Sequence, residues 1–296
     1  MTLLFAFPEQ AALARIMSIE QGDWEWRHFP DGESYVRILS AVRGKPAAIL
    51  CSLNQPDTKT LPLIFLAQTL KELGAAKVTL VAPYLGYMRQ DTRFHEGEAV
   101  TSETFAVMLS RYIDALITVD PHLHRHHDLK ESYTCECKSL SAASLMAEWI
   151  GKNIKHALII GPDMESEQWV KEVAEEVQAP YIVLQKTRHG DRDVEITLPD
   201  IGRYKNHTPV LIDDIISTAA TMIKAVELLK AQGFADITCL ATHGLFAGNA
   251  YDALQKAGAA QIITANTIPH PSNGMEVAEL LAAECVNPRY GEQSRQ

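Results

Sequence analysis

The chain contains few cysteines and no apolar run long enough to span a membrane. Its 296 residues include five cysteines, an odd number that is scattered along the sequence. Cys135-Glu136-Cys137 lacks the second cysteine or histidine pair that a zinc site needs at regular spacing. We therefore expect a reduced, cytoplasmic protein. The apolar start, residues 1–8, is short and has no basic residue, so we expect a first strand there rather than a signal peptide.

Positive charge is also scarce. The 27 Lys and Arg residues face 37 Asp and Glu residues, which gives a formal net charge of −10. This balance argues against a partner such as nucleic acid or a membrane surface, because binders of either display a basic field. A protein of this charge that binds anionic substrates must concentrate its positive charge locally, and residues 89–93 and 186–192 are the candidates.

Apolar β-rich runs alternate with helical patterns along the whole chain, which indicates an α/β fold with parallel sheets. A segment at residues 24–39 differs, because two extended runs flank a turn and predict a projecting hairpin. We place a domain boundary near residues 137–141, which gives domains 1–140 and 141–296. Whether the last helix, at residues 275–284, packs on the first or the second domain stays open. The expected strands are residues 3–7, 47–53, 78–83, 115–119, 157–160, 181–185, 210–212, 237–241 and 261–264.

The most informative stretch runs from Pro209 to Met222 and predicts a strand, a short loop and a helix. Asp213 and Asp214 end the strand, and a hydroxyl-rich turn brings backbone N–H groups to a helix N-terminus, which favours a phosphate. Ligands of open α/β sheets bind at this edge. The alternative is an ordinary turn with Ser/Thr caps. We favour a sugar-phosphate site, because two adjacent aspartates at the end of a buried strand are costly without a partner.

This stretch resembles the phosphoribosyl-diphosphate loop of the type I phosphoribosyltransferase fold. Further segments narrow the resemblance to the ribose-phosphate diphosphokinases (PRPP synthetases), in the family's order and at comparable spacing. Ile215-Ile216-Ser217-Thr218 is similar to the archaeal-like subgroup. The other segments are Asp31-Gly32-Glu33, Tyr84-Leu85-Gly86-Tyr87-Met88-Arg89-Gln90-Asp91, Val119-Asp120-Pro121-His122, Gly161-Pro162-Asp163 and Lys186-Thr187-Arg188.

The resemblance implies two phosphoribosyltransferase-like (Rossmann-like) domains with parallel sheets and a β-hairpin flag in the N-terminal domain. It implies transfer of the diphosphoryl group of ATP to the anomeric hydroxyl of ribose 5-phosphate, with Mg²⁺ as cofactor, in a homo-oligomer built from dimers. Two other functions stay open. A phosphoribosyltransferase would leave the flag and Arg89-Gln90 unexplained, and a non-catalytic regulatory subunit would not need its charged site residues intact.

The resemblance also assigns roles to residues. Lys186 and Arg188 are the expected catalytic cations, on a mobile loop. ATP is expected at Phe29, Asp31, Gly32, Glu33, Arg89, Gln90 and Asp91. Ribose 5-phosphate is expected at Arg188, Asp213, Asp214, Ser217, Thr218, Ala219, Ala220 and Thr221, and the metal at His122 and Asp163.

Each assignment has a simpler alternative. Lys186 and Arg188 could begin a solvated loop, Asp31-Gly32 is a common hairpin turn, and Asp163 could cap a helix. His124, His126 and His127 follow His122 and resemble a transition-metal cluster, but alternate histidines on a loop need not converge. Ala220 stands where the family's phosphate loop usually has glycine, which lets the backbone approach a phosphate closely or adopt a positive φ.

Overall fold

The computed structural model describes residues 1–123, 128–188, 194–197 and 201–286, and it divides into two compact units. One unit comprises Met1–Leu140 together with the chain from Val277 onward, and the other is Ser141–Glu276. The sequence placed the whole of 141–296 in one domain. The structure differs at the C-terminal end, because the last helix packs in the first unit.

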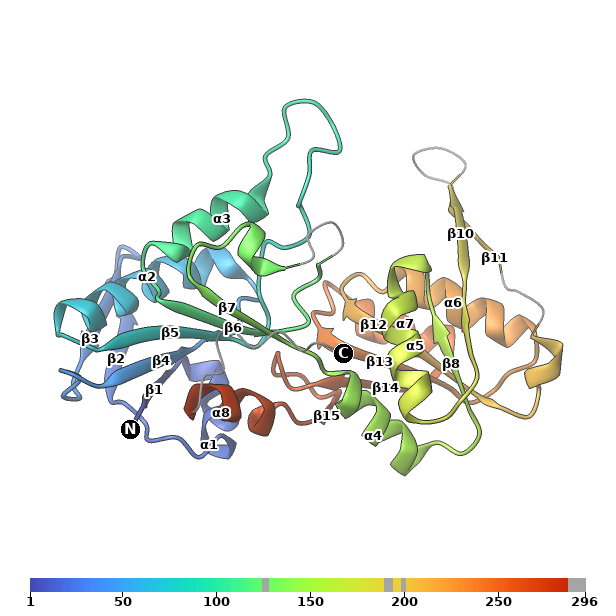
Figure 1. Cartoon of the computed structure of the whole chain (residues 1–296). Helices are drawn as coiled ribbons and strands as arrows, with labels where there is room; N and C mark the ends of the chain where they lie inside the picture. Colours follow the sequence, from blue (N-terminus) through green and yellow to red (C-terminus); the bar gives the residue numbers. More distant parts are fainter. Residues whose placement is uncertain (124–127, 189–193, 198–200, 287–296) are drawn as a thin grey trace. The chain divides into compact units, whose positions relative to one another are not determined.

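The first unit is built on a five-stranded parallel sheet in the order β1-β4-β5-β6-β7. Four of its strands, β1, β4, β5 and β6, are mostly buried, as expected of parallel strands covered on both faces, whereas the edge strand β7 is mostly half-buried or exposed. In Figure 1, α2 and α3 cover one face of this sheet and α1 and α8 the other. The strands are β1 (Leu3–Ala6), β4 (Pro46–Leu50), β5 (Lys77–Ala82), β6 (Ala115–Val119) and β7 (Glu136–Leu140); the helices are η1 (Pro8–Gln10), α1 (Ala11–Ile16), α2 (Pro56–Glu72), α3 (Thr101–Ser110), η2 (Leu129–Glu131) and α8 (Ala278–Val286).

The predicted hairpin is present as a separate two-stranded antiparallel sheet, β2 (Trp24–His28) with β3 (Ser34–Ile38). Aromatic packing anchors it to the core of the first unit. The rings of Trp24 and Trp26 lie parallel with their centroids 6.4 Å apart. Both are tilted against the ring of buried Phe7, with centroid distances of 5.2 and 5.0 Å. Trp24 Nε1 donates to the Ala6 carbonyl over 3.2 Å, which satisfies the indole N–H.

The second unit has a six-stranded parallel sheet in the order β15-β14-β13-β12-β8-β9. Gly233 follows its helix α6 with φ +90, the left-handed conformation in which glycine commonly ends a helix. The strands are β8 (Ala157–Gly161), β9 (Tyr181–Val183), β12 (Thr208–Ile216), β13 (Ile237–Gly244), β14 (Ala259–Ala265) and β15 (Asn273–Met275); the helices are α4 (Ala143–Asn153), η3 (Met164–Ser166), α5 (Glu167–Glu176), η4 (Gly202–Tyr204), α6 (Ala220–Ala231) and α7 (Ala250–Ala257).

β7 and β15 were not among the expected strands, and β12 continues to Ile216, past the aspartates that were expected to end it. Lys186, Thr187 and Arg188, expected on a loop, lie in β10 (Gln185–Arg188), which pairs antiparallel with β11 (Val194–Thr197). Residues 189–193 of that expected loop lie outside the described residues. The last helix, α8, packs on α1, and Thr2 Oγ1 donates to the Cys285 carbonyl over 3.4 Å. This packing answers the question that the sequence left open.

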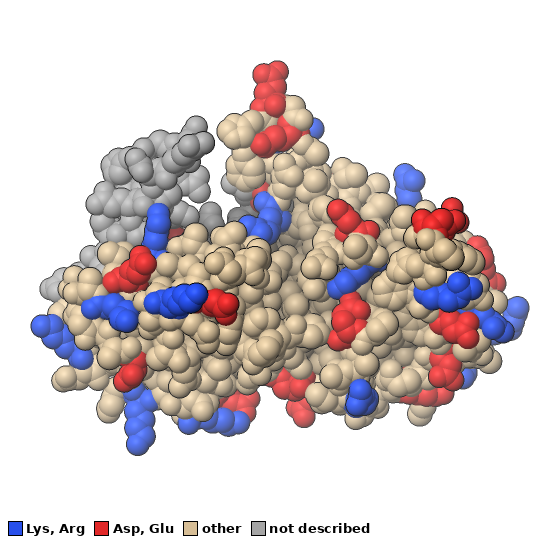
Figure 2. Space-filling view, turned by 180° about the vertical axis from the view of Figure 1, so that it is seen from behind, with Lys and Arg blue, Asp and Glu red and all other residues tan. Residues whose placement is uncertain are grey.

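Acidic and basic side chains are interspersed over the face seen in Figure 2, and no continuous basic field lies on its described part. All five cysteines are free thiols, and three of them are buried: Cys51, Cys239 and Cys285. Within the described ranges, no helix is both long enough and apolar enough to cross a membrane.

Candidate active site

The tip of the hairpin carries Phe29, Asp31, Gly32 and Glu33. The turn is closed by Phe29 N–H donating to the Glu33 carbonyl over 2.8 Å and by Gly32 N–H donating to the Phe29 carbonyl over 2.9 Å. Gly32 has φ +93, a conformation that glycine adopts without strain. All four residues are exposed, and the Arg27 guanidinium lies 4.8 Å from the Phe29 ring. The hairpin therefore presents an exposed aromatic ring and a cation together.

Arg89, Gln90 and Asp91 follow β5 through a tight turn at Gly86. A Cβ added at Gly86 would lie 2.6 Å from the Leu53 carbonyl oxygen, so only glycine allows this approach of the two segments. Ser102 N–H donates to the Gln90 carbonyl over 3.3 Å, which ties the segment to the start of α3. Arg89 is exposed, while Gln90 and Asp91 are half-buried.

His122 follows β6 on a strained turn. Asp120 has φ +36 and His122 has φ +55, both in the left-handed region that disfavours side chains with a Cβ. His122 N–H donates to the Asp120 carbonyl over 2.9 Å, and Asp120 N–H donates to Leu140 at the end of β7 over 2.9 Å. Strain of this kind persists only where the surroundings enforce it, and it is concentrated at functional sites. His124, His126 and His127 lie outside the described residues.

Three carboxylates lie together in the second unit at the carboxyl edge of its sheet. β8 and β12 pair in parallel, with Leu158 opposite Pro209; Asp163 follows the end of β8, and Asp213 lies in the C-terminal half of β12. Loss of solvation raises the pKa of the half-buried Asp213 well above its ordinary value, and the neighbouring charges of Asp214 and Asp163 add to this. Such a cluster favours a cation or a hydroxyl donor as its partner.

The loop Ser217–Ala219 joins β12 to α6, whose first turn contains Ala220 and Thr221. Ala219 caps α6 with φ +60 and ψ +8, and its side chain makes no capping hydrogen bond. Ala220 is the first residue of α6 and does not share this conformation. The sequence raised the question of a missing glycine at Ala220, but the left-handed residue is Ala219. The backbone N–H groups at the start of α6 can donate hydrogen bonds to a phosphate.

The structure places the remaining predicted residues as follows. The backbones of Lys186 and Arg188 lie in β10, opposite Ile196 and Val194. The two expected metal ligands, His122 and Asp163, belong to different units. Among the residues that the structure describes, no group of three or more His, Cys, Asp or Glu side chains is arranged to hold a metal ion by itself.

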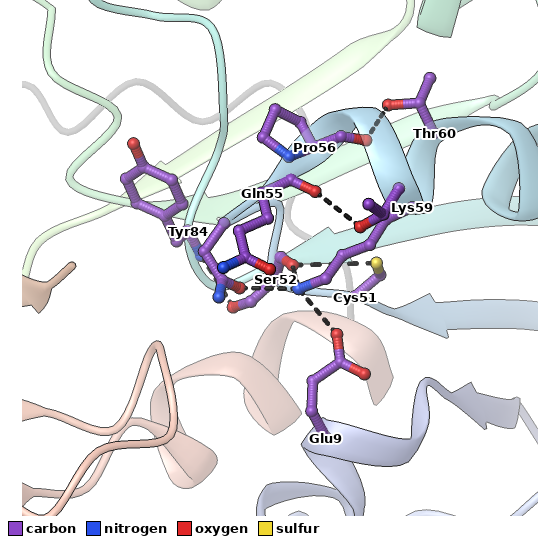
Figure 3. A network of polar contacts seen from close by, with 10 residues as sticks. Glu9, Cys51, Ser52, Gln55, Pro56, Lys59, Thr60 and Tyr84 are labelled. Atoms are coloured by element: carbon purple, nitrogen blue, oxygen red, sulfur yellow. Dashed lines mark hydrogen bonds and ion pairs between the residues drawn. The ribbon is translucent and has the colours of Figure 1, made fainter. Parts of the chain in front are cut away.

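One polar network beside the Arg89 segment was missed by the sequence analysis. Lys59 is buried at the start of α2, where Figure 3 shows its ammonium group between oxygen atoms of neighbouring segments. The sequence pattern gave no role to Asp57 or Lys59. The signal that could have placed them was Pro56, since proline favours the first turn of a helix.

Comparison with known proteins gives likenesses that extend through both units. Residues 8–112 match the family model described as the N-terminal domain of ribose phosphate pyrophosphokinase, and residues 137–280 match the phosphoribosyl transferase domain. The ribose-phosphate pyrophosphokinase of Sulfolobus acidocaldarius is 34% identical over 272 residues, 90% of each chain. That of Saccharolobus solfataricus is 35% identical over 262 residues, 87% of this chain and 88% of its own. A phosphoribosylpyrophosphate synthetase structure from Mycobacterium smegmatis has a TM-score of 0.86 at 26% identity and covers 96% of this chain and 97% of its own.

Replacing Ala219 by glycine should stabilise the protein. The left-handed conformation costs a residue with a Cβ about 1–2 kcal/mol, and the greater freedom of glycine in the unfolded chain offsets part of this gain. We expect Ala219→Gly to raise the free energy of unfolding in urea by about 0.5–1 kcal/mol. Ala220→Gly is the matched control and should give no gain. Equal effects of the two substitutions would contradict the assignment of the strain to Ala219.

Replacing Asp213 by asparagine should stabilise the ligand-free protein at neutral pH. A carboxyl whose pKa is raised on folding contributes stability below the ordinary Asp pKa of about 3.9, and this contribution is lost as the pH rises through the folded pKa. Asparagine carries no charge and keeps an oxygen for the Asp214 N–H, which Asp213 Oδ1 accepts over 3.0 Å. Thermal unfolding at pH 8 should therefore show a higher Tm for Asp213→Asn than for the wild type, and the gain should shrink toward pH 4. The exposed Asp252→Asn serves as control; a lower Tm for Asp213→Asn at pH 8 would refute the argument.

Proposed function

The chain belongs to the ribose-phosphate pyrophosphokinase family, and on this premise we propose that it transfers the diphosphoryl group of ATP to ribose 5-phosphate, which gives 5-phosphoribosyl 1-diphosphate and AMP. It is an enzyme of this class, and its curated archaeal relatives agree with the subgroup expected from its sequence. The observation that carries the proposal is the extent of the likeness, which includes the hairpin and both parallel sheets rather than the phosphate loop alone.

The sugar phosphate is bound by the β12–α6 connection. The N–H groups and hydroxyls of Ser217–Thr221 receive the 5-phosphate, as expected at a helix N-terminus. Asp213 and Asp214 accept hydrogen bonds from the ribose hydroxyls. Hydroxyl donors satisfy carboxylates that are costly to leave unpaired, and the raised pKa of Asp213 supports this pairing.

ATP is bound by residues of the first unit. Phe29 stacks on the adenine. Asp31, Gly32 and Glu33, at the hairpin tip, form hydrogen bonds with the edge of the base. The planar guanidinium of Arg89 donates hydrogen bonds to two oxygens of the triphosphate. Gln90 and Asp91 lie beside Arg89 and also contact the nucleotide. The exposure of the hairpin tip and of Arg89 supports these roles, because both are accessible to a ligand.

Mg²⁺ is the cofactor, with His122 and Asp163 as its protein ligands together with phosphate oxygens. A carboxylate oxygen suits this ion, and a cation beside Asp163 offsets the repulsion that raises the pKa of Asp213. When bound, Mg²⁺ neutralises charge on the phosphates. Lys186 and Arg188 supply positive charge where negative charge develops on the transferring diphosphoryl group. Asp213 and the phosphate loop hold the attacking sugar in line with the phosphorus.

The activity is tested by incubating the protein with Mg-ATP and ribose 5-phosphate. AMP and phosphoribosyl diphosphate should form in equal amounts, and chelation of Mg²⁺ should stop both. A protein that instead consumes phosphoribosyl diphosphate and attaches a base is a phosphoribosyltransferase. One that does neither, but binds an active synthetase, is a regulatory subunit.

Lys186→Ala should lower turnover by at least about a hundredfold while ATP binding changes little, because the lysine charge acts mainly on the transition state. Turnover and the equilibrium binding of ATP are measured on the same preparation. The control is Lys152→Ala, since Lys152 lies on the surface of α4 and pairs with Glu148 in the same helix. Comparable turnover in Lys186→Ala and the wild type would remove Lys186 from the catalytic role.

The protein is cytoplasmic and assembles as a homo-oligomer of dimers in which each hairpin tip serves the adenine of a neighbouring subunit. The test mixes two inactive proteins, a Phe29→Ala/Glu33→Ala double mutant and Lys186→Ala. With random exchange, half of the dimers are mixed and each has one intact site, so about a quarter of all sites regain activity. No recovery, after subunit exchange has been verified by mass spectrometry, would show that the hairpin serves its own chain.

A further inference from the structure

The first turn of α2 carries a buried ammonium group. The Lys59 side chain is only 9% exposed, and its Nζ lies 2.7 Å from the carbonyl oxygen of Ser52, from Asn54 Oδ1 and from Glu9 Oε1. Figure 3 shows the ammonium between these segments. The contacts to Ser52 and Asn54 are hydrogen bonds and the contact to Glu9 is an ion pair, so the buried ammonium has polar partners and an opposite charge. Because a buried charge without partners is very costly, the position of residues 52–54 is fixed relative to α2.

Ser52 and Leu53 in turn hold the start of the segment that carries Arg89. Tyr84 N–H donates to Ser52 Oγ over 3.3 Å, and Leu53 N–H donates to the Tyr84 carbonyl over 2.8 Å. Two residues later Gly86 lies directly against the Leu53 carbonyl. Lys59 thus fixes the backbone of residues 84–86 indirectly, through the intervening segment 52–54.

A second residue of the same helical turn holds Tyr87. The Tyr87 hydroxyl donates to the Asp57 carboxylate, and this hydrogen bond raises the pKa of Tyr87 above its ordinary value. Tyr87 has φ +62, a strained conformation for a tyrosine, and it lies two residues before Arg89. The bond to Asp57 and the tilted packing of the ring on Phe105 at 4.7 Å keep Tyr87 in this conformation.

We propose that Lys59 and Asp57 are positioning residues of the nucleotide site: the first turn of α2 sets the conformation of residues 84–91, and this conformation aims Arg89 and Gln90 at the triphosphate. Neither residue touches ATP. Lys59 acts through Ser52 and Tyr84, and Asp57 acts through Tyr87. The inference rests on the proposed function, since it takes Arg89 and Gln90 as ATP ligands.

The test measures the Michaelis constants for both substrates in Lys59→Met and Tyr87→Phe. Methionine keeps the length of the lysine without its charge, and phenylalanine keeps the ring without the hydroxyl. Each substitution should raise KM for ATP by about tenfold and leave KM for ribose 5-phosphate within about twofold, because only the nucleotide segment loses its support. Tyr87→Phe removes no buried charge, so it still tests the proposal if Lys59→Met does not fold.

Two further variants separate positioning from general stability. Asp57→Asn keeps an oxygen that accepts from Tyr87 and should retain most of the ATP affinity, whereas Asp57→Ala should lose about as much as Tyr87→Phe. Lys71→Met is the matched control on the same helix, where the lysine pairs with Asp114 away from residues 84–91. It should leave both Michaelis constants unchanged even if it lowers Tm.

A double-mutant cycle with Arg89→Ala decides the mechanism. If Lys59 and Tyr87 act by aiming Arg89, their substitutions should add much less to the KM for ATP once Arg89 is absent. Equal increases in both Michaelis constants, full additivity with Arg89→Ala, or no change in Tyr87→Phe would each overturn the inference. Failure of the proposed function is distinguishable, because it would show as no AMP formation by the wild type or as no effect of Arg89→Ala alone on equilibrium binding of Mg-ATP.

Discussion

In both units the strands of the main sheet run parallel, so every polar group that follows a strand meets its neighbours at one edge of the sheet. Asp163 follows β8, Asp213 lies in the C-terminal half of the neighbouring strand β12, and their carboxylates interact although 50 positions of sequence separate them. In the first unit, β4, β5 and β6 end in the same way at Ser52, Tyr84 and Asp120, the start of three of the segments discussed above. Burial of the strands on both faces leaves this edge as the place where the chain can carry reactive side chains.

The cost of this arrangement is electrostatic and conformational. Asp213 carries a carboxyl whose charge is disfavoured by its surroundings, and Asp120, His122, Tyr87 and Ala219 all adopt left-handed backbone conformations near strand ends or helix starts. Each of these features lowers stability in the ligand-free protein. Ligands that carry hydroxyl donors, phosphate and a divalent cation offset such costs when they bind. The same residues therefore stabilise the complex and destabilise the ligand-free fold.

The parallel strands and the motif segments could be predicted because their signals are local: runs of buried residues, turn residues and charged groups in a fixed order. The residues that could not be predicted depend on contacts between distant segments. The sequence around Lys59 resembles that of an exposed residue, and only the structure shows its contacts with Ser52 and Glu9. Asp57 acquires a role through its hydrogen bond with Tyr87. β10 was taken for the start of a loop because its four residues are all polar and lack the alternation of a half-buried strand. Ala219 and Ala220 are chemically identical, so only the backbone distinguishes the strained one.

The path of the chain through the two units has a consequence for biosynthesis. The chain leaves the first unit after Leu140 and re-enters it at Val277, so the second unit is inserted between β7 and α8. During translation the five parallel strands of the first unit emerge early, but the surface of α1 that receives α8 stays uncovered until the whole inserted unit has been made. The unit that begins to fold first is therefore the last to be completed, and the apolar face of α1 must be kept from wrong partners on the ribosome while the inserted unit folds.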